Sequence, residues 1–121
     1  MVGLVIGVSA QSSDAKQIFE KAVGLANGEK FAEALPGLKK SLALAETEAA
    51  DAGFRAKIHF NIGVCLYRLK QNAASVGEFE KAIKLARRRY EKAFYALGMA
   101  QYELKNWKQA EEAFRGALRI N

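Results

Sequence analysis

Apolar residues recur at intervals of three and four along most of the chain, with almost no alternation of apolar and polar positions. This spacing places apolar side chains on one face of an α-helix, whereas strict alternation would indicate β-strands. The helical pattern begins after Ser13 and Asp14, which are both good N-cap residues. Breaks fall at Asn27-Gly28, Gln71-Asn72 and Lys105-Asn106. The pattern therefore predicts an all-α chain of three antiparallel helical hairpins.

The hairpins repeat one unit, over residues 15–48, 56–89 and 91–121. Small residues recur at matched points, as expected where two helices cross closely. These columns are Ala22, Gly63 and Gly98 (here called the small-residue slot), then Ala34, Ser75 and Ala110, and then Ser41, Ala82 and Ala117. The residues expected to fill the hairpin cores are Phe31, Asn72, Trp107, Leu38, Phe79, Phe114, Leu44, Leu85 and Ile120.

Two irregularities interrupt the repeat. The second unit starts 41 residues after the first, and the third starts 35 residues after the second. The extra residues near Thr47 to Gly53 are rich in Ala and acidic residues, so we expect them to lengthen the flanking helices rather than form a loop. Pro36 has no amide hydrogen, so we expect a kink or a late helix start in the first unit.

The third unit resembles a tetratricopeptide repeat, in residues 94–102 and then Trp107, Ala110, Phe114 and Ala117. The second unit matches through Ile62-Gly63, Phe79 and Ala82, although His59 replaces the usual Trp; the first unit is more divergent. The resemblance covers residues 15–121 and implies an α-solenoid, a tetratricopeptide-like superhelix whose first helices line a concave surface.

One helical face of each first helix is expected to line that concave groove. Four positions recur on this face relative to the small-residue slot: a lysine six residues before it, an aromatic three before it, and residues one and four after it. The predicted groove residues are Lys16, Phe19, Val23, Lys57, Phe60, Asn61, Val64, Tyr67, Lys92, Tyr95, Met99 and Tyr102. An apolar and aromatic floor with a lysine rim suits a peptide or helix from a partner protein.

Some relatives of this family clamp acidic chaperone tails with lysines, asparagines and an arginine on this face. Only Asn61 and Lys92 match that set. Phe19, Val23 and Ala96 stand where Lys, Asn and Arg would be needed. The resemblance therefore implies protein binding without recognition of a chaperone tail.

Charge leaves two alternatives to partner binding open. The net charge is +6, of which residues 1–48 contribute −1 and the remainder +7. Arg87, Arg88 and Arg89 could contact an anion, which makes polyanion binding a minor alternative, although basic residues also suit a helix C-terminus. Nucleic acid is not expected, because the recurrent polar pair of helical RNA-reading repeats is absent. The other alternative is self-assembly, most simply into a dimer, through the groove and the apolar end at Leu118 and Ile120.

Catalytic, metal and cofactor chemistry is not expected. One Cys and one His cannot supply a Cys/His zinc site or a disulfide framework. His59 occupies an interior aromatic slot and Cys65 lies among small interior residues, so both are interpreted as packed rather than reactive. No glycine-rich loop follows a strand, so the usual nucleotide cradles are not expected either.

Residues 1–14 form an apolar leader whose Val8-Ser9-Ala10 resembles a signal cleavage site, although no basic segment precedes it. A periplasmic or secreted location follows if the leader is a signal remnant, and a cytoplasmic one otherwise. No apolar run approaches the roughly 20 residues of a membrane-spanning helix.

Overall fold

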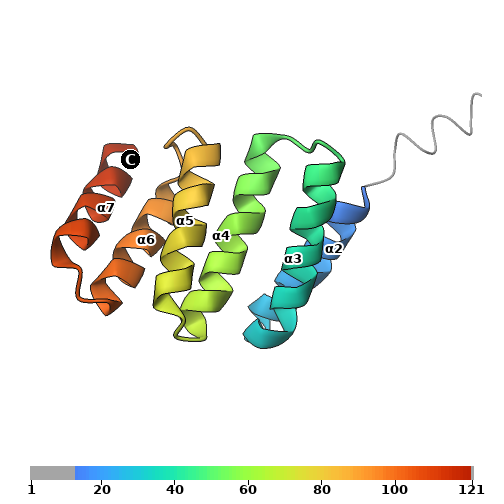
Figure 1. Ribbon diagram of the computed structural model, residues 1–121, viewed down its shortest axis with the longest axis horizontal. Helices are drawn as coiled ribbons and strands as arrows, with labels where there is room; N and C mark the ends of the chain where they lie inside the picture. The colour runs from blue at the N-terminus through green and yellow to red at the C-terminus, as the bar shows by residue number, and fades with distance from the viewer. Residues whose placement is uncertain (1–12, 121) are drawn as a thin grey trace, which may run out of the picture.

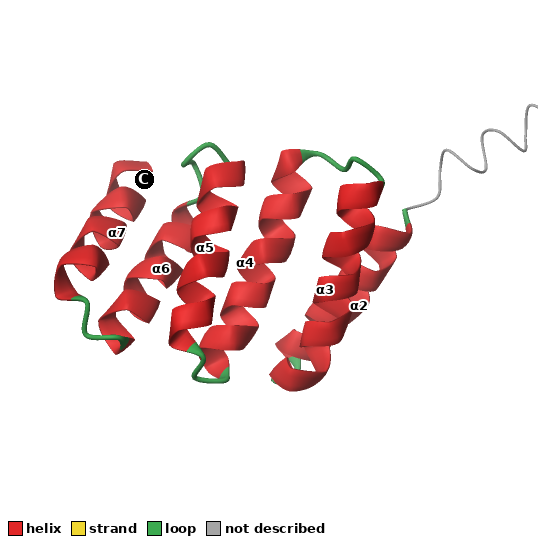
Figure 2. Ribbon diagram, in the orientation of Figure 1, coloured by secondary structure: helices red, strands yellow, loops and turns green. Residues whose placement is uncertain are grey.

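The computed structural model describes residues 13–120, which form six helices. They are α2 (Asp14–Asn27), α3 (Phe31–Thr47), α4 (Ala52–Arg68), α5 (Asn72–Leu85), α6 (Glu91–Glu103) and α7 (Trp107–Ile120). The helices follow one another in chain order from one end of the molecule to the other (Figure 1). No strand occurs between residues 13 and 120 (Figure 2). The predicted all-α solenoid of three hairpins is confirmed; the possible signal remnant lies outside the described residues.

All three hairpins close with the same turn. Its left-handed residue is Glu29, Lys70 or Lys105, with φ of 62°, 65° and 63°. The next residue donates its backbone N–H to the carbonyl five positions earlier, as from Lys30 to Leu25 at 2.9 Å and from Gln71 to Leu66 at 2.8 Å. Such bonds satisfy carbonyls that a helix C-terminus would leave unpaired. The repetition seen in the sequence therefore extends to the backbone.

The irregular spacing between the first two hairpins is absorbed by longer helices, as predicted. Helices α3 and α4 have 17 residues each, whereas the other four have 13 or 14. The side chain of Asp51 caps α4 by accepting a hydrogen bond from the N–H of Phe54 at 2.8 Å. This early start brings Phe54 alongside α2, where its ring meets that of Phe19 edge-on at 5.4 Å between centroids.

Close crossing at the small-residue slot holds each hairpin together. A Cβ on Gly63 would lie 2.6 Å from Cε1 of Phe79, and a Cβ on Gly98 would lie 2.5 Å from Cε1 of Phe114. The phenylalanine ring of the second helix therefore occupies the space that a side chain would fill. In the first hairpin the slot holds Ala22, and the fully buried Leu38 stands where the other hairpins have phenylalanine.

The core runs from hairpin to hairpin. Ile58, Ile62 and Cys65 of α4 are fully or almost fully buried beside the first hairpin, and Ile83 of α5 packs with Phe94 of α6. Burial raises the pKa of the Cys65 thiol, as expected for a residue that serves only packing. Among residues 13–120 no helix is long and apolar enough to cross a membrane.

The late helix start expected at Pro36 is wrong. Helix α3 begins at Phe31 and runs through Pro36. The prolyl ring is exposed, and Ala32, whose carbonyl would have accepted its missing N–H, is exposed too, so water can solvate that carbonyl. Burial of Ala34 and Leu38 on the opposite face holds the helix in place.

Two residues assigned to the hairpin core are exposed instead. Trp107 is 57% exposed and Ile120 is 37% exposed. The counterpart of Trp107 in the first hairpin, Phe31, lies beneath the guanidinium of Arg68, 4.5 Å from the ring centroid, because a following hairpin supplies that arginine. No described residue follows α7 to cover the corresponding positions. The exposure of apolar side chains at this end was predicted, but its extension to Trp107 was not.

Replacing Gly63 by Ala should lower the free energy of unfolding by about 1 to 3 kcal/mol, because the new methyl group would overlap the buried Phe79 ring. Gly77→Ala on α5 is the control: nothing lies within 4 Å of the added Cβ, so helix propensity should raise stability by about 0.5 to 1 kcal/mol. In a Phe79→Leu background, which copies the first hairpin, Gly63→Ala should cost much less. Urea denaturation of the parent chain, Gly63→Ala, Phe79→Leu and the double variant measures these costs. An equal cost of Gly63→Ala in both backgrounds would contradict the packing argument.

Candidate functional site

A groove of about 720 Å³ opens between the second and third hairpins. Most of its lining residues come from the first helices α4 and α6, and the rest come from the second helices α5 and α7. Its lining residues are Phe60, Val64, Tyr67, Phe79, Glu91, Lys92, Tyr95, Ala96, Met99, Phe114, Ala117 and Leu118. Only Glu91 and Lys92 carry a charge, so the surface suits apolar and aromatic side chains of a ligand.

Six predicted groove residues meet in this groove, namely Phe60, Val64, Tyr67, Lys92, Tyr95 and Met99. Tyr102 lines an adjoining hollow together with Tyr67 and Met99. Lys57 and Asn61 lie on α4 outside these lining sets; the Asn61 side-chain amide donates to the carbonyl of Lys57 at 2.8 Å. The face defined by the repeat is therefore shared by α4 and α6.

The first hairpin contributes nothing to this groove. Phe19 and Val23 are partly buried against the core of the first two hairpins. Lys16 places its ammonium 5.9 Å from the centroid of Phe54. The early start of α4 supplies Phe54, and this ring occupies the surface that Phe19 was expected to offer to a ligand.

The sequence pattern did not point to the groove residues of the second helices. Phe79 and Phe114 were assigned to the hairpin cores, yet each also lines the groove. Leu118 was expected only to be exposed, and it is 74% exposed while lining the same groove. The glycines at the small-residue slot could have indicated that these two rings reach the groove. A phenylalanine ring that packs directly on a glycine of the first helix can extend past that helix to the surface.

Tyrosines give the groove its polar groups. Partial burial of Tyr67, together with the negative charge of Glu103, raises the pKa of its hydroxyl. Tyr95 and Tyr102 are more than half exposed, and the Tyr102 ring meets Trp107 at 5.1 Å. A neutral phenol presents one donor and one acceptor beside an apolar ring, which is useful for orienting a bound backbone.

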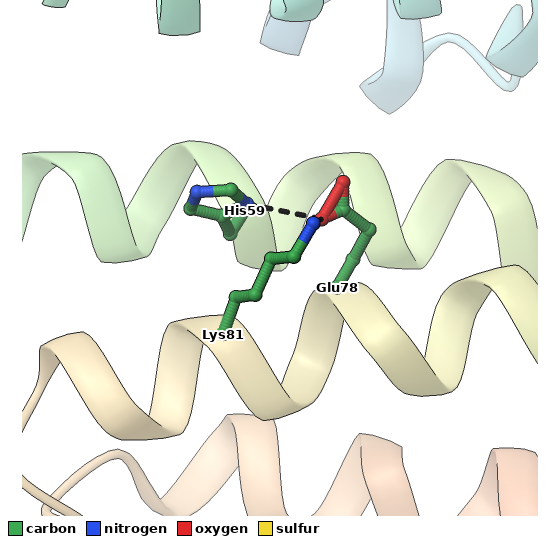
Figure 3. Close-up of polar contacts among 3 residues, drawn as sticks. All are labelled: His59, Glu78 and Lys81. Atoms are coloured by element: carbon green, nitrogen blue, oxygen red, sulfur yellow. Dashed lines mark hydrogen bonds and ion pairs between the residues drawn. The ribbon is translucent and has the colours of Figure 1, made fainter. Parts of the chain in front are cut away.

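His59 of α4 is not among the groove-lining residues, and its ring contacts the Glu78 carboxylate of α5 (Figure 3). Its Nδ1 lies 3.0 Å from Oε2 of Glu78, and the Lys81 ammonium lies 3.8 Å from the same oxygen. Burial favours a raised pKa for Glu78, but the hydrogen bond and charge of His59, with Lys81 and Lys39, outweigh it and lower the pKa. The interior position predicted for His59 is confirmed, whereas its carboxylate partner was not foreseen.

The three arginines of the basic cluster lie in the turn before α6. Arg87 and Arg88 both have positive φ, of 52° and 62°, and all three side chains are exposed. The Arg88 guanidinium lies 5.2 Å from the centroid of the Phe94 ring. Among residues 13–120 no group of three or more His, Cys, Asp or Glu side chains is arranged to hold a metal ion.

Comparison with known protein families gives two matches, both to the tetratricopeptide repeat, at residues 56–89 and residues 92–120. No curated protein sequence matches the chain significantly. With the three hairpins described above, these matches show that the chain belongs to the tetratricopeptide repeat family.

Solved structures of the same fold match at low sequence identity. The second tetratricopeptide domain of Spaghetti (RPAP3), bound to the HSP90 peptide SRMEEVD, is 18% identical with a TM-score of 0.77, over 90% of this chain and 94% of that chain. MamA from Desulfovibrio magneticus RS-1 is 20% identical with a TM-score of 0.73, over 89% and 56%. A chain of the CopN–Scc3 complex is 15% identical with a TM-score of 0.75, over 90% and 59%. At these identities the likeness establishes the fold alone.

The Glu78 carboxylate should stabilise the fold in a pH-dependent way. Because its pKa in the folded chain is lowered, its contribution is fully present above the ordinary value of 4.5 and is lost as the pH falls through the folded value. Glu78→Gln should therefore cost about 1 to 2 kcal/mol at pH 7 and progressively less as the solution is acidified. Chemical denaturation from pH 7 to pH 3 measures this difference, with Glu80→Gln, on an exposed neighbour, as the control. A constant cost across that range would contradict the assigned role.

Proposed function

We propose that the chain is a protein-interaction scaffold that binds a segment of a partner protein in the groove between α4 and α6. The observation that carries this proposal is the groove itself, about 720 Å³ in volume and lined by apolar and aromatic side chains with two charged residues at its edge. A surface of this size holds several ligand side chains and excludes water from them. The groove exposes three large side chains that could anchor a ligand, namely Tyr67, Met99 and Tyr95. A domain that binds no partner has no reason to expose them.

The fold neighbours support this use of the scaffold. The Spaghetti domains are seen with an HSP90 peptide, and another neighbour is a chain of a protein complex. The ligand chemistry proposed here differs from that of the acidic HSP90 peptide, because only Asn61 and Lys92 match the carboxylate-clamping set. Phe19 and Val23 are packed inward in the place of two further clamp residues. The groove is therefore suited to an apolar, aromatic-anchored segment.

Self-association is the second candidate, favoured by the apolar residues exposed at the α7 end. Leu118 is 74% exposed and Trp107 is 57% exposed. A second copy could cover them and bury part of each groove. Light scattering across a concentration series tests this, and a mass that stays at 13.3 kDa at high micromolar concentration would eliminate the candidate.

The affinity of bound peptides should depend strongly on the Tyr67 ring and only weakly on salt concentration. Twelve-residue peptides selected from a random display library should carry a large apolar or aromatic residue, and their affinity should change by less than about threefold between 50 and 500 mM salt. Tyr67→Ala should weaken them by at least about tenfold, and Tyr67→Phe should retain most of the affinity because the ring remains. Circular dichroism checks that both variants fold.

Selection of acidic peptides whose affinity falls steeply with salt would instead indicate an anion site. In that case binding should depend on Arg87, Arg88 and Arg89, and their joint replacement by Gln should abolish it. Tyr67→Ala would then have little effect, and the groove proposal would be wrong.

A further inference from the structure

An ion pair and a stacked ring join the first two hairpins near their turns. The Arg68 guanidinium at the end of α4 donates to Oε1 of Glu29 at 3.1 Å and lies 4.5 Å from the centroid of the Phe31 ring. Glu29 is the left-handed residue of the first turn, and Phe31 begins α3. At this junction a carboxylate and an aromatic ring together hold a basic side chain.

The next junction has the opposite charges at the same repeat positions. Counted from the small-residue slot, the equivalents of Glu29, Phe31 and Arg68 are Lys70, Asn72 and Glu103. Glu103 shares a small hollow of about 150 Å³ with Arg68 and Lys70. It nevertheless forms no ion pair with any residue between 13 and 120. The second junction therefore leaves a carboxylate without a cationic partner in the described chain.

The Glu103 carboxylate also borders a second hollow, of about 320 Å³, here called the end hollow. The other residues that line it are Tyr67, Met99, Tyr102 and Phe114. Partial burial of Tyr67 and the charge of Glu103 both raise the pKa of the Tyr67 hydroxyl, so the carboxylate lies near this phenol. The end hollow combines one carboxylate with three aromatic rings and a thioether.

The end hollow continues the groove along the concave surface. Tyr67, Met99 and Phe114 line both the groove and the end hollow, whereas Glu103 lines only the end hollow. Tyr67 is the repeat equivalent of Tyr102, and it lines the groove even though its hairpin packs against a neighbour on each side. Access to this face therefore comes from the repeat geometry and does not require an end hairpin.

Several local charges favour a cation in the end hollow. Glu103 is the last residue of α6, where the helix dipole places partial negative charge, and this helix has no basic residue in its last turn. The faces of the tyrosine rings carry negative partial charge as well. A basic side chain is attracted by all of these groups, whereas an acidic side chain is repelled by them.

We infer that the end hollow receives a basic side chain, arginine or lysine, from the segment that the groove binds. The inference rests on the proposed function and adds one charged position to the apolar ligand proposed there. The aliphatic stem of this side chain packs on Met99 and Phe114, and its cation pairs with Glu103 as Arg68 pairs with Glu29. The basic residue therefore lies at a fixed spacing from the apolar residues that fill the groove.

Peptide selection against two forms of the whole chain tests this inference. Twelve-residue peptides selected on the parent chain should carry Arg or Lys at one fixed spacing from a large apolar residue. On Glu103→Lys the same position should change to Asp or Glu, with the apolar residue kept. Glu112→Lys, at an exposed position on α7 outside the groove and the end hollow, raises the net charge equally and should still select the basic residue. The parent net charge of +6 works against non-specific capture of basic peptides.

A double-mutant cycle then measures the contact. Fluorescence anisotropy with a labelled parent-selected peptide, at 50 mM salt, should show that Glu103→Gln weakens binding by roughly three- to tenfold. Replacing the basic residue of the peptide by Gln should cost a similar factor, and the two changes together should cost little more than either one. Glu112→Gln should leave the affinity within twofold. Circular dichroism checks that each variant folds, as the exposure of Glu103 and Glu112 predicts.

Three outcomes would overturn the inference. Peptides with the apolar residue but without a basic residue at fixed spacing would reject the cation site and leave the groove proposal intact. Costs that multiply independently in the cycle would show that the basic residue contacts a group other than Glu103. Enrichment of no peptide would reject the groove proposal and this inference together.

Discussion

The close approach of two helices at one small residue is the constraint on which the rest of the structure depends. At Gly63 and Gly98 the ring of a phenylalanine from the second helix lies where a Cβ would be. This contact fixes how near the two helices lie and, through the helical period, which side chains face outward. In the first hairpin a larger slot residue, Ala22, is combined with a smaller residue on the second helix, Leu38, and both are buried. The residue at the slot and the residue opposite it are therefore matched in size: a larger residue at the slot goes with a smaller one on the second helix.

Hairpins with one internal geometry acquire different surfaces through their junctions. The longer α3 and α4 bring Phe54 against Phe19, which closes the first hairpin's share of the concave face. The connection before α6, residues 86–90, supplies Tyr90 from the N-cap position, which covers Phe60 and leaves Val64 and Tyr67 accessible. The groove occupies the second and third hairpins for this reason, although all three repeats carry the same pattern.

Much of this architecture could be predicted from the sequence, because helical period, break residues and small-residue columns are local properties. The helix lengths at the junction followed from composition, and the interior position of Cys65 followed from its neighbours. What could not be predicted depends on the neighbouring hairpin. Trp107 has the periodicity of a core residue but no cover, and Phe54 lies in the junction, outside the repeat columns. The partnership of His59 with Glu78 joins residues 19 positions apart and depends on how two helices are aligned.

Each hairpin packs against the hairpins that adjoin it in the chain, so cooperativity is passed along the array rather than shared by one central core. The middle hairpin is supported on both sides, whereas the third has a neighbour on one side only among the described residues. Amide hydrogens of α6 and α7 should therefore exchange with solvent through partial opening events that leave α4 and α5 protected. A ligand held in the groove would contact both α4 and α6, and it should therefore slow exchange at residues of the last hairpin that it never touches. Occupancy of the groove would thus be measurable in the dynamics of the whole last hairpin.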